Sequence, residues 1–146
     1  MPAQPRALEA VTVEALELSP ELRTALLGHA RAAAPREACG LLIGRRERKL
    51  TRVERVLALR NVALSRSAFE IEPLDVLAAE RDALASGSTV VGAWHSHVDA
   101  PASPSPRDLA HGGYSLQLVV SLVGPSLRAW RGIEEIPLVE PPPRAT

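Results

Sequence analysis

Residues 94–108 read Trp-His-Ser-His-Val-Asp-Ala-Pro-Ala-Ser-Pro-Ser-Pro-Arg-Asp, and we interpret the rest of the chain around this stretch. In a β-strand, side chains spaced i, i+2 point to the same face, so we expect His95 and His97 to project together. The loop that follows is long enough to bring Asp108 back to the end of that strand. Two imidazoles and one carboxylate, with a fourth position open to water, form the ligand pattern of catalytic zinc. The stretch therefore predicts a metal site made by His95, His97 and Asp108.

The last four residues of the stretch also have a purely structural interpretation. Ser105-Pro106-Arg107-Asp108 is typical of a helix start, with a capping serine, a proline in the first turn and an acid at the third helical position. Capping is compatible with metal binding, because it fixes the direction in which Asp108 points. The Ser105 hydroxyl could also donate a hydrogen bond to the oxyanion of a tetrahedral intermediate.

A base that is not itself a metal ligand would assist such a site by moving a proton to the leaving group. Glu37 is the leading candidate, because it lies between Pro35 and an apolar segment, where a charged side chain is otherwise poorly placed. Cys39, two residues later, could be a nucleophile or a redox-sensitive group. Free cysteines are usually small buried residues, and this is the interpretation we prefer for Cys39.

The composition indicates one globular domain. The chain has 146 residues, of which 46% are hydrophobic and 23% charged, and 17 basic residues balance 17 acidic ones. This balance gives no indication of nucleic acid or an anionic membrane as a partner. We expect the domain to cover residues 8–140, with flexible tails at 1–7 and 141–146.

Two features favour a cytoplasmic location. Cys39 is the only cysteine, so no internal disulfide can form, which suits a reducing compartment. The N-terminal segment lacks the apolar core of a signal peptide, and no apolar run approaches the ~20 residues of a membrane span. We therefore expect a cytoplasmic protein without a membrane partner.

Hydrophobic periodicity predicts alternating strands and helices, and therefore a mixed sheet flanked by helices in an α/β fold. The expected strands are 8–18, 37–44, 50–62, 69–71, 89–97, 114–123, 126–131 and 133–139. The expected helices run from Pro20 to just before Pro35, from Pro73 to just before Gly87, and from Pro106 to about His111. We expect the leucine stripes of the helices, Trp94 and Trp130 to be core, and residues 45–49 to form a solvated hairpin turn.

The spacing of these residues resembles that of the JAMM/MPN+ metalloproteases, in particular their compact prokaryotic branch. The resemblance covers residues 10–135 and rests on His95-x-His97, Ser105 and Asp108, preceded by Glu37 in a Glu-Ala-Cys-Gly-Leu-Leu context. Segments 61–63 and 69–73 are also similar to that branch, whereas Val98 stands where many relatives have proline.

The resemblance implies a cytidine-deaminase-like fold in which His95, His97 and Asp108 bind Zn²⁺, Glu37 is the acid/base and Ser105 stabilises the oxyanion. It also implies cleavage after the C-terminal Gly-Gly of a ubiquitin-like protein. The chain is short, so we expect a sulfur-carrier substrate of the ThiS or MoaD kind. The protein could also form a homodimer. The alternative is a non-catalytic MPN scaffold that binds protein partners. A zinc nucleoside deaminase is disfavoured, because its H-x-E and P-C-x-x-C motifs are absent from the sequence.

Overall fold

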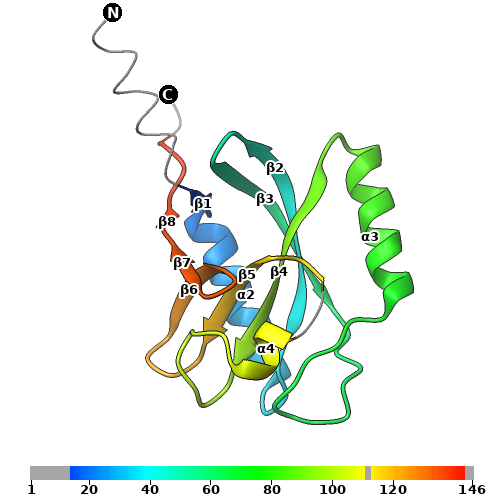
Figure 1. Ribbon diagram of the computed structural model, residues 1–146, viewed down its shortest axis with the longest axis vertical. Helices are drawn as coiled ribbons and strands as arrows, with labels where there is room; N and C mark the ends of the chain where they lie inside the picture. Colours follow the sequence, from blue (N-terminus) through cyan, green and yellow to red (C-terminus); the bar gives the residue numbers. More distant parts are fainter. Residues whose placement is uncertain (1–13, 111–112, 144–146) are drawn as a thin grey trace, which may run out of the picture.

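A computed structural model describes residues 14–110 and 113–143, which form one eight-stranded mixed sheet with helices on both faces (Figure 1). The strands are β1 (Ala15–Glu17), β2 (Cys39–Glu47), β3 (Leu50–Leu59), β4 (Thr89–His97), β5 (Leu116–Ser121), β6 (Ser126–Arg131), β7 (Glu134–Ile136) and β8 (Leu138–Val139). The helices are α2 (Pro20–Ala33), α3 (Pro73–Ala85) and α4 (Pro106–Ala110). The strand order is β7-β6-β5-β4-β2-β3-β1-β8, so β4 lies near the middle of the sheet. The predicted mixed α/β architecture is confirmed.

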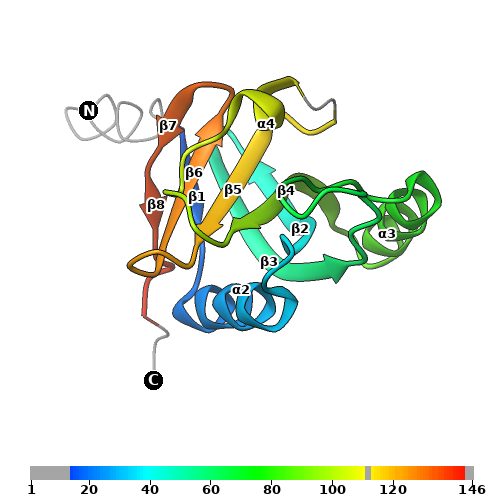
Figure 2. The same cartoon turned by 90° about the horizontal axis from the view of Figure 1, so that it is seen from below.

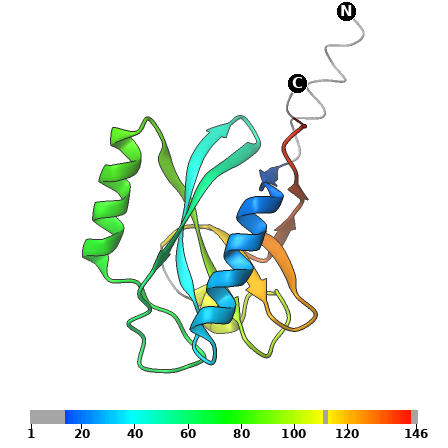
Figure 3. The ribbon, with the colours of Figure 1, turned by 180° about the vertical axis from the view of Figure 1, so that it is seen from behind.

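The two long helices cover opposite faces of the sheet (Figures 2 and 3). Leu26 and Ala30 of α2 pack in one hydrophobic cluster with Leu42 and Trp94. Neighbouring strand residues point to the opposite face, where Leu41 and Ala93 pack with Ala79 of α3. His95 and His97 follow Ala93 at positions i+2 and i+4 of the same strand, so their side chains also lie on the α3 face of the sheet.

Helix α2 begins as its sequence predicts. The Ser19 hydroxyl accepts a hydrogen bond from the Leu22 backbone N–H at 3.2 Å, and Pro20 opens the first turn. The helix ends at Ala33, before Pro35.

Helix α3 corrects one prediction, that its leucine stripe belongs to the core. Leu74 and Leu84 are 70% and 76% exposed, and the residues that pack on the sheet are Ala79 and Ala83. These alanines are spaced i, i+4 and so form a narrow face that lets the helix approach the sheet closely. The leucines occupy the opposite side, where nothing within the described residues covers them.

Two predicted strands also differ from the structure. Residues 69–71 form no strand; Ile71 makes only an isolated antiparallel bridge to Asn61. The strand expected over 133–139 divides at Pro137, which has no N–H to donate to a ladder. Its first part, β7, pairs with β6, whereas β8 pairs with β1.

The remaining predictions agree with the elements to within a few residues. Residues 45–49 are exposed and contain the predicted β2–β3 turn, in which Arg48 has a φ of 57°. Trp94 and Trp130 are buried as predicted. The part of the first expected strand that precedes Glu14, and His111 at the end of the short helix, lie outside the described residues. None of the helices in the described part of the chain has the length and apolar character needed to cross a membrane.

The absence of a side chain at Gly40 of β2 allows the Trp94 indole on β4 to form a hydrogen bond with β3. The indole Nε1–H of Trp94 donates to the carbonyl of Leu57 at 3.1 Å. A Cβ atom at Gly40 would overlap that carbonyl oxygen and lie 2.7 Å from the Trp94 Nε1 atom. Only glycine therefore fits between them without movement of the backbone.

Candidate metal centre

The end of β4 brings His95 and His97 together with Asp108 of α4, which lies at the end of this strand (Figure 1). The Nε2 atoms of His95 and His97 lie 3.0 and 3.1 Å from the same carboxylate oxygen, Oδ2 of Asp108. Both histidines are buried, and the Asp108 side chain is only 7% exposed. These three residues are the one His/Cys/Asp/Glu group with metal-ligand proximity among the described residues.

Asp108 is aimed by the helix start that the sequence predicts. The backbone N–H of Ser105 donates to Asp108 Oδ2 at 2.8 Å, and the Asp108 N–H donates to the Ser105 hydroxyl oxygen at 3.1 Å. Burial alone would raise the pKa of Asp108, but hydrogen bonds from His95, His97 and Ser105 hold it well below its usual value. Asp108 therefore stays ionised at every physiological pH.

His97 is oriented through its second ring nitrogen. Nδ1 lies 2.7 Å from the carbonyl oxygen of Pro101, which can only accept a hydrogen bond, so Nδ1 carries the proton. Nε2 is thereby the nitrogen that faces Asp108. An outer hydrogen bond of this kind fixes the tautomer of histidines that bind metals.

His95 is oriented by packing. The ring of Phe69 stacks on the His95 ring, with centroids 4.4 Å apart and planes inclined by 15°. Phe69 belongs to residues 60–72, which we name the β3–α3 loop. Phe69 is part of the sequence resemblance, but no local pattern in the sequence indicates its contact with His95.

Glu37 lies just before β2 and is buried. Burial raises its pKa to about 7; the negative charge of Asp108 adds to the rise and His97 opposes it. Its Oε1 atom has no hydrogen-bond partner among the described residues. A buried carboxyl group that is half-ionised near neutral pH has the property that a general base requires.

Asn61 ties Glu37 to the β3–α3 loop. Its side-chain N–H groups donate to the carbonyls of Glu37 and Ala68, both at 2.9 Å. Its side-chain oxygen accepts from the backbone N–H groups of Ala63 and Glu70, both at 3.0 Å. All four hydrogen-bonding positions of the amide are thus used. No pattern in the sequence indicates this role of Asn61.

A pocket of about 220 Å³ opens beside Glu37. It is lined by residues from the segment before β2, from the β3–α3 loop and from the chain directly after β4: Pro35, Glu37, Arg66, Ser67, Val98 and Asp99. Glu37 thus lines an open pocket although its side chain is buried.

Cys39 does not share the properties of the site. It is buried, and burial raises the pKa of its thiol to about 12, with the charge of Glu37 as a second cause. The thiol is therefore neutral at physiological pH and a poor nucleophile, in agreement with the preferred interpretation from sequence.

The donor set fits a tetrahedral metal ion. Two ligands, each about 2.05 Å from zinc, lie about 3.3 Å apart, close to the observed separations between the histidine nitrogens and Asp108. His97 faces an acceptor at each ring nitrogen, and its pKa is raised: burial lowers it, but the hydrogen bond to Asp108 outweighs this effect. A cation in place of the Nε2 proton would satisfy the same carboxylate.

The model of a protein family described as prokaryotic homologs of the JAB domain matches residues 19–132. The chain belongs to this family. A solved structure of protein DSY2949 from Desulfitobacterium hafniense, 32% identical, superimposes with a TM-score of 0.76 over 86% of this chain and 92% of its own. The predicted JAMM/MPN resemblance and fold are thereby confirmed.

Three curated relatives have names that bear on function. A probable TtuB-protein conjugate cleaving protease of Thermus thermophilus is 38% identical over 63% of this chain and 60% of its own length. A desampylase of Haloferax volcanii is 30% identical over 67% of this chain and 73% of its own length. The tail tip assembly protein K of Escherichia phage N15 is 36% identical over 81% of this chain. The match spans 46% of that phage protein and 60% of the Thermus protein, so this chain covers about half to three fifths of the lengths of these two relatives.

Proposed function

We propose that this JAB-family protein is a zinc-dependent isopeptidase or peptidase that hydrolyses the bond after the C-terminal Gly-Gly of a ubiquitin-like or sulfur-carrier protein. The observation that carries the proposal is the convergence of two histidine Nε2 atoms on one Asp108 oxygen, close to a buried Glu37 whose pKa is about 7. Three metal ligands beside a base that is not itself a ligand are typical of a hydrolytic rather than a structural metal site.

His95, His97 and Asp108 would hold the ion. A bound zinc supplies a Lewis acid and lowers the pKa of water in its open position to roughly 7. Glu37, half-ionised near neutral pH, accepts a proton from the attacking water and returns it to the leaving amine. The pKa of Asp108 is held well below that of Glu37, so Asp108 is the weaker base and does not compete for that proton.

Ser105 has a second role in the proposal. Its hydroxyl oxygen accepts from the Asp108 N–H, which leaves the hydroxyl hydrogen able to donate. That hydrogen would stabilise the developing oxyanion.

The names of two relatives support a protein conjugate as the substrate. One is a TtuB-protein conjugate cleaving protease and the other a desampylase. The pocket beside Glu37, about 220 Å³ in volume, has room for small residues such as the glycines of a Gly-Gly tail.

The direct experiment is to incubate the zinc-loaded protein with several carrier proteins fused through a Gly-Gly tail, and to map the products by mass. We expect cleavage directly after the second glycine, loss of cleavage with a chelator, and recovery with added zinc. Asp108→Asn, which keeps the size of the side chain, is the matched inactive control. Cleavage that survives the chelator, or a zinc-loaded protein that cleaves none of the fusions, would contradict the proposal.

A further inference from the structure

Residues 98–105, which we name the β4–α4 loop, are held by the sheet through three consecutive backbone carbonyls. The carbonyls of residues 100–102 each bind a side chain from a different strand. Ser121 of β5 donates to the first at 2.6 Å, and His97 of β4 to the second at 2.7 Å. The indole Nε1–H of Trp130 on β6 donates to the third at 2.9 Å. Strands β4, β5 and β6 are neighbours in the sheet, so the loop lies across their ends as one unit.

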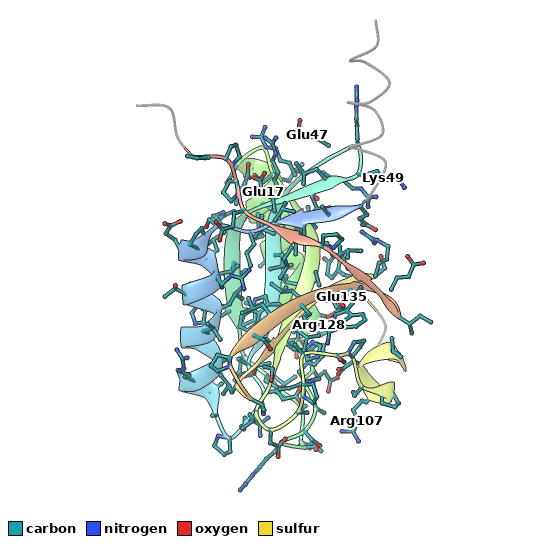
Figure 4. All side chains as sticks on the ribbon, turned by 90° about the vertical axis from the view of Figure 1, so that its left-hand side faces the viewer. Glu17, Glu47, Lys49, Arg107, Arg128 and Glu135 are labelled. Carbon is teal, nitrogen blue, oxygen red and sulfur yellow. The ribbon has the colours of Figure 1, made fainter. Side chains whose placement is uncertain are left out.

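The donors on β5 and β6 are themselves fixed. Ser121 is completely buried, and Trp130 packs with Ala102 and Val119 in a separate small hydrophobic cluster. Arg128 lies over the Trp130 ring, 4.9 Å from its centroid, and is held there by two hydrogen bonds to Glu135 (Figure 4). The Trp130 ring therefore packs against both apolar side chains and the Arg128 guanidinium group.

The loop connects two of the metal-ligand candidates. Its middle carbonyl, that of Pro101, fixes the tautomer of His97, and its last residue, Ser105, caps the helix that carries Asp108. A shift of residues 100–102 would release the Nδ1 hydrogen bond of His97 and move the start of α4. Neither the Ser121 hydroxyl nor the Trp130 indole donates to a ligand side chain. They hold the carbonyls on either side of Pro101, and Ser121 is also the neighbour of His97 in the β4–β5 ladder.

We propose that Ser121 and Trp130 are positioning residues of the metal centre, whose hydrogen bonds to the β4–α4 loop set the affinity for the ion. This inference rests on the proposed metal site, and it extends that site to two strands that supply no ligand. Outer hydrogen bonds of this kind change metal affinity about 10- to 100-fold.

The test measures zinc affinity by titration calorimetry and, separately, the melting temperature of the chelated protein. Trp130→Phe keeps an aromatic ring but removes the N–H donor together with part of the indole ring, and Ser121→Ala removes only the hydroxyl. We expect each to weaken zinc binding on the order of tenfold. Ser121→Thr, which keeps a hydroxyl, should restore most of the affinity.

The matched control is Trp94→Phe. This substitution removes the same kind of buried indole donor, which in this case bonds to the Leu57 carbonyl. Trp94 lies on the α2 face of the sheet, opposite to the face that carries His95 and His97. It should lower the melting temperature of the chelated protein and leave zinc affinity unchanged. Wild-type affinity in both Trp130→Phe and Ser121→Ala, or an equal loss in Trp94→Phe, would overturn the proposal. Absence of zinc binding by the wild type would also overturn it, whereas zinc binding without cleavage would contradict only the proposed function.

Discussion

The β3–α3 loop and the β4–α4 loop both support the proposed site, and the molecule fixes them in different ways. Asn61 alone makes four hydrogen bonds within the first loop and to Glu37, and Arg36 adds bonds to two of its carbonyls. Three donors on three strands hold the second loop. The first loop bears on Glu37 and, through Phe69, on His95; the second bears on His97 and Asp108. In the proposed mechanism, proton transfer would therefore depend mainly on Asn61, whereas metal retention would depend on several donors.

Glu37→Gln separates these two functions most sharply. The carboxamide cannot take up the proton, so we expect cleavage of a Gly-Gly fusion to fall on the order of 100- to 10,000-fold. Zinc content should remain that of the wild type, because Glu37 is not among the proposed ligands. Single-turnover cleavage and metal analysis of the same sample measure both quantities. Undiminished turnover in the zinc-loaded variant would remove Glu37 from the mechanism.

The same variant has a consequence for stability. The pKa of Glu37 is raised in the folded protein from 4.5 to about 7, so its stabilising contribution is present below pH 4.5 and is lost as pH rises to about 7. Chelated Glu37→Gln should therefore be more stable than the chelated wild type at pH 8. The difference should shrink at pH 5, which urea unfolding at both values would measure.

Asn61→Ala should loosen the whole β3–α3 loop. Four hydrogen bonds of about 1 kcal/mol each are lost, so we expect a loss of about 2–4 kcal/mol in the free energy of unfolding. Cleavage should fall about 10- to 100-fold, because Glu37 and Phe69 lose their support, while zinc affinity changes less than in Trp130→Phe. Urea unfolding and zinc titration provide the comparison. A larger loss of zinc affinity in Asn61→Ala than in Trp130→Phe would reverse the assignment of the two loops.

The proposed ligands could be predicted from the sequence because each of them belongs to a short local pattern. The i, i+2 spacing of His95 and His97 determines a shared strand face, and the Ser-Pro-Arg-Asp segment determines a helix start that aims Asp108. The roles of Asn61, Ser121 and Trp130 depend on contacts across 7 to 28 residues, for which no short pattern exists. The leucines of α3 were misplaced because periodicity reveals an apolar stripe without showing which side meets the sheet.

The pH dependence should distinguish the loops further. Glu37 must be ionised to accept a proton, so kcat/KM should fall about tenfold per pH unit below about pH 7. In Asn61→Ala, greater exposure of Glu37 should move this acidic limb toward the ordinary pKa of a glutamate. In Trp130→Phe, assayed with saturating zinc, the limb should stay near pH 7. An unshifted limb in Asn61→Ala would show that the loop does not control the burial of Glu37.

The smallest effect is expected at the tip of the β3–α3 loop. Leu64 is fully exposed, so Leu64→Ser should change the free energy of unfolding by less than about 0.5 kcal/mol. Zinc affinity should also remain unchanged. A destabilisation comparable with that of Asn61→Ala, in the same urea titration, would mean that the loop is held by its tip rather than by Asn61.

Metal analysis of the purified protein at neutral pH decides whether His95, His97 and Asp108 hold one catalytic ion. We expect one zinc ion per chain in the wild type and in Glu37→Gln, and none in Asp108→Asn. A wild-type protein without stoichiometric metal, or an Asp108→Asn variant that keeps its zinc, would contradict this expectation.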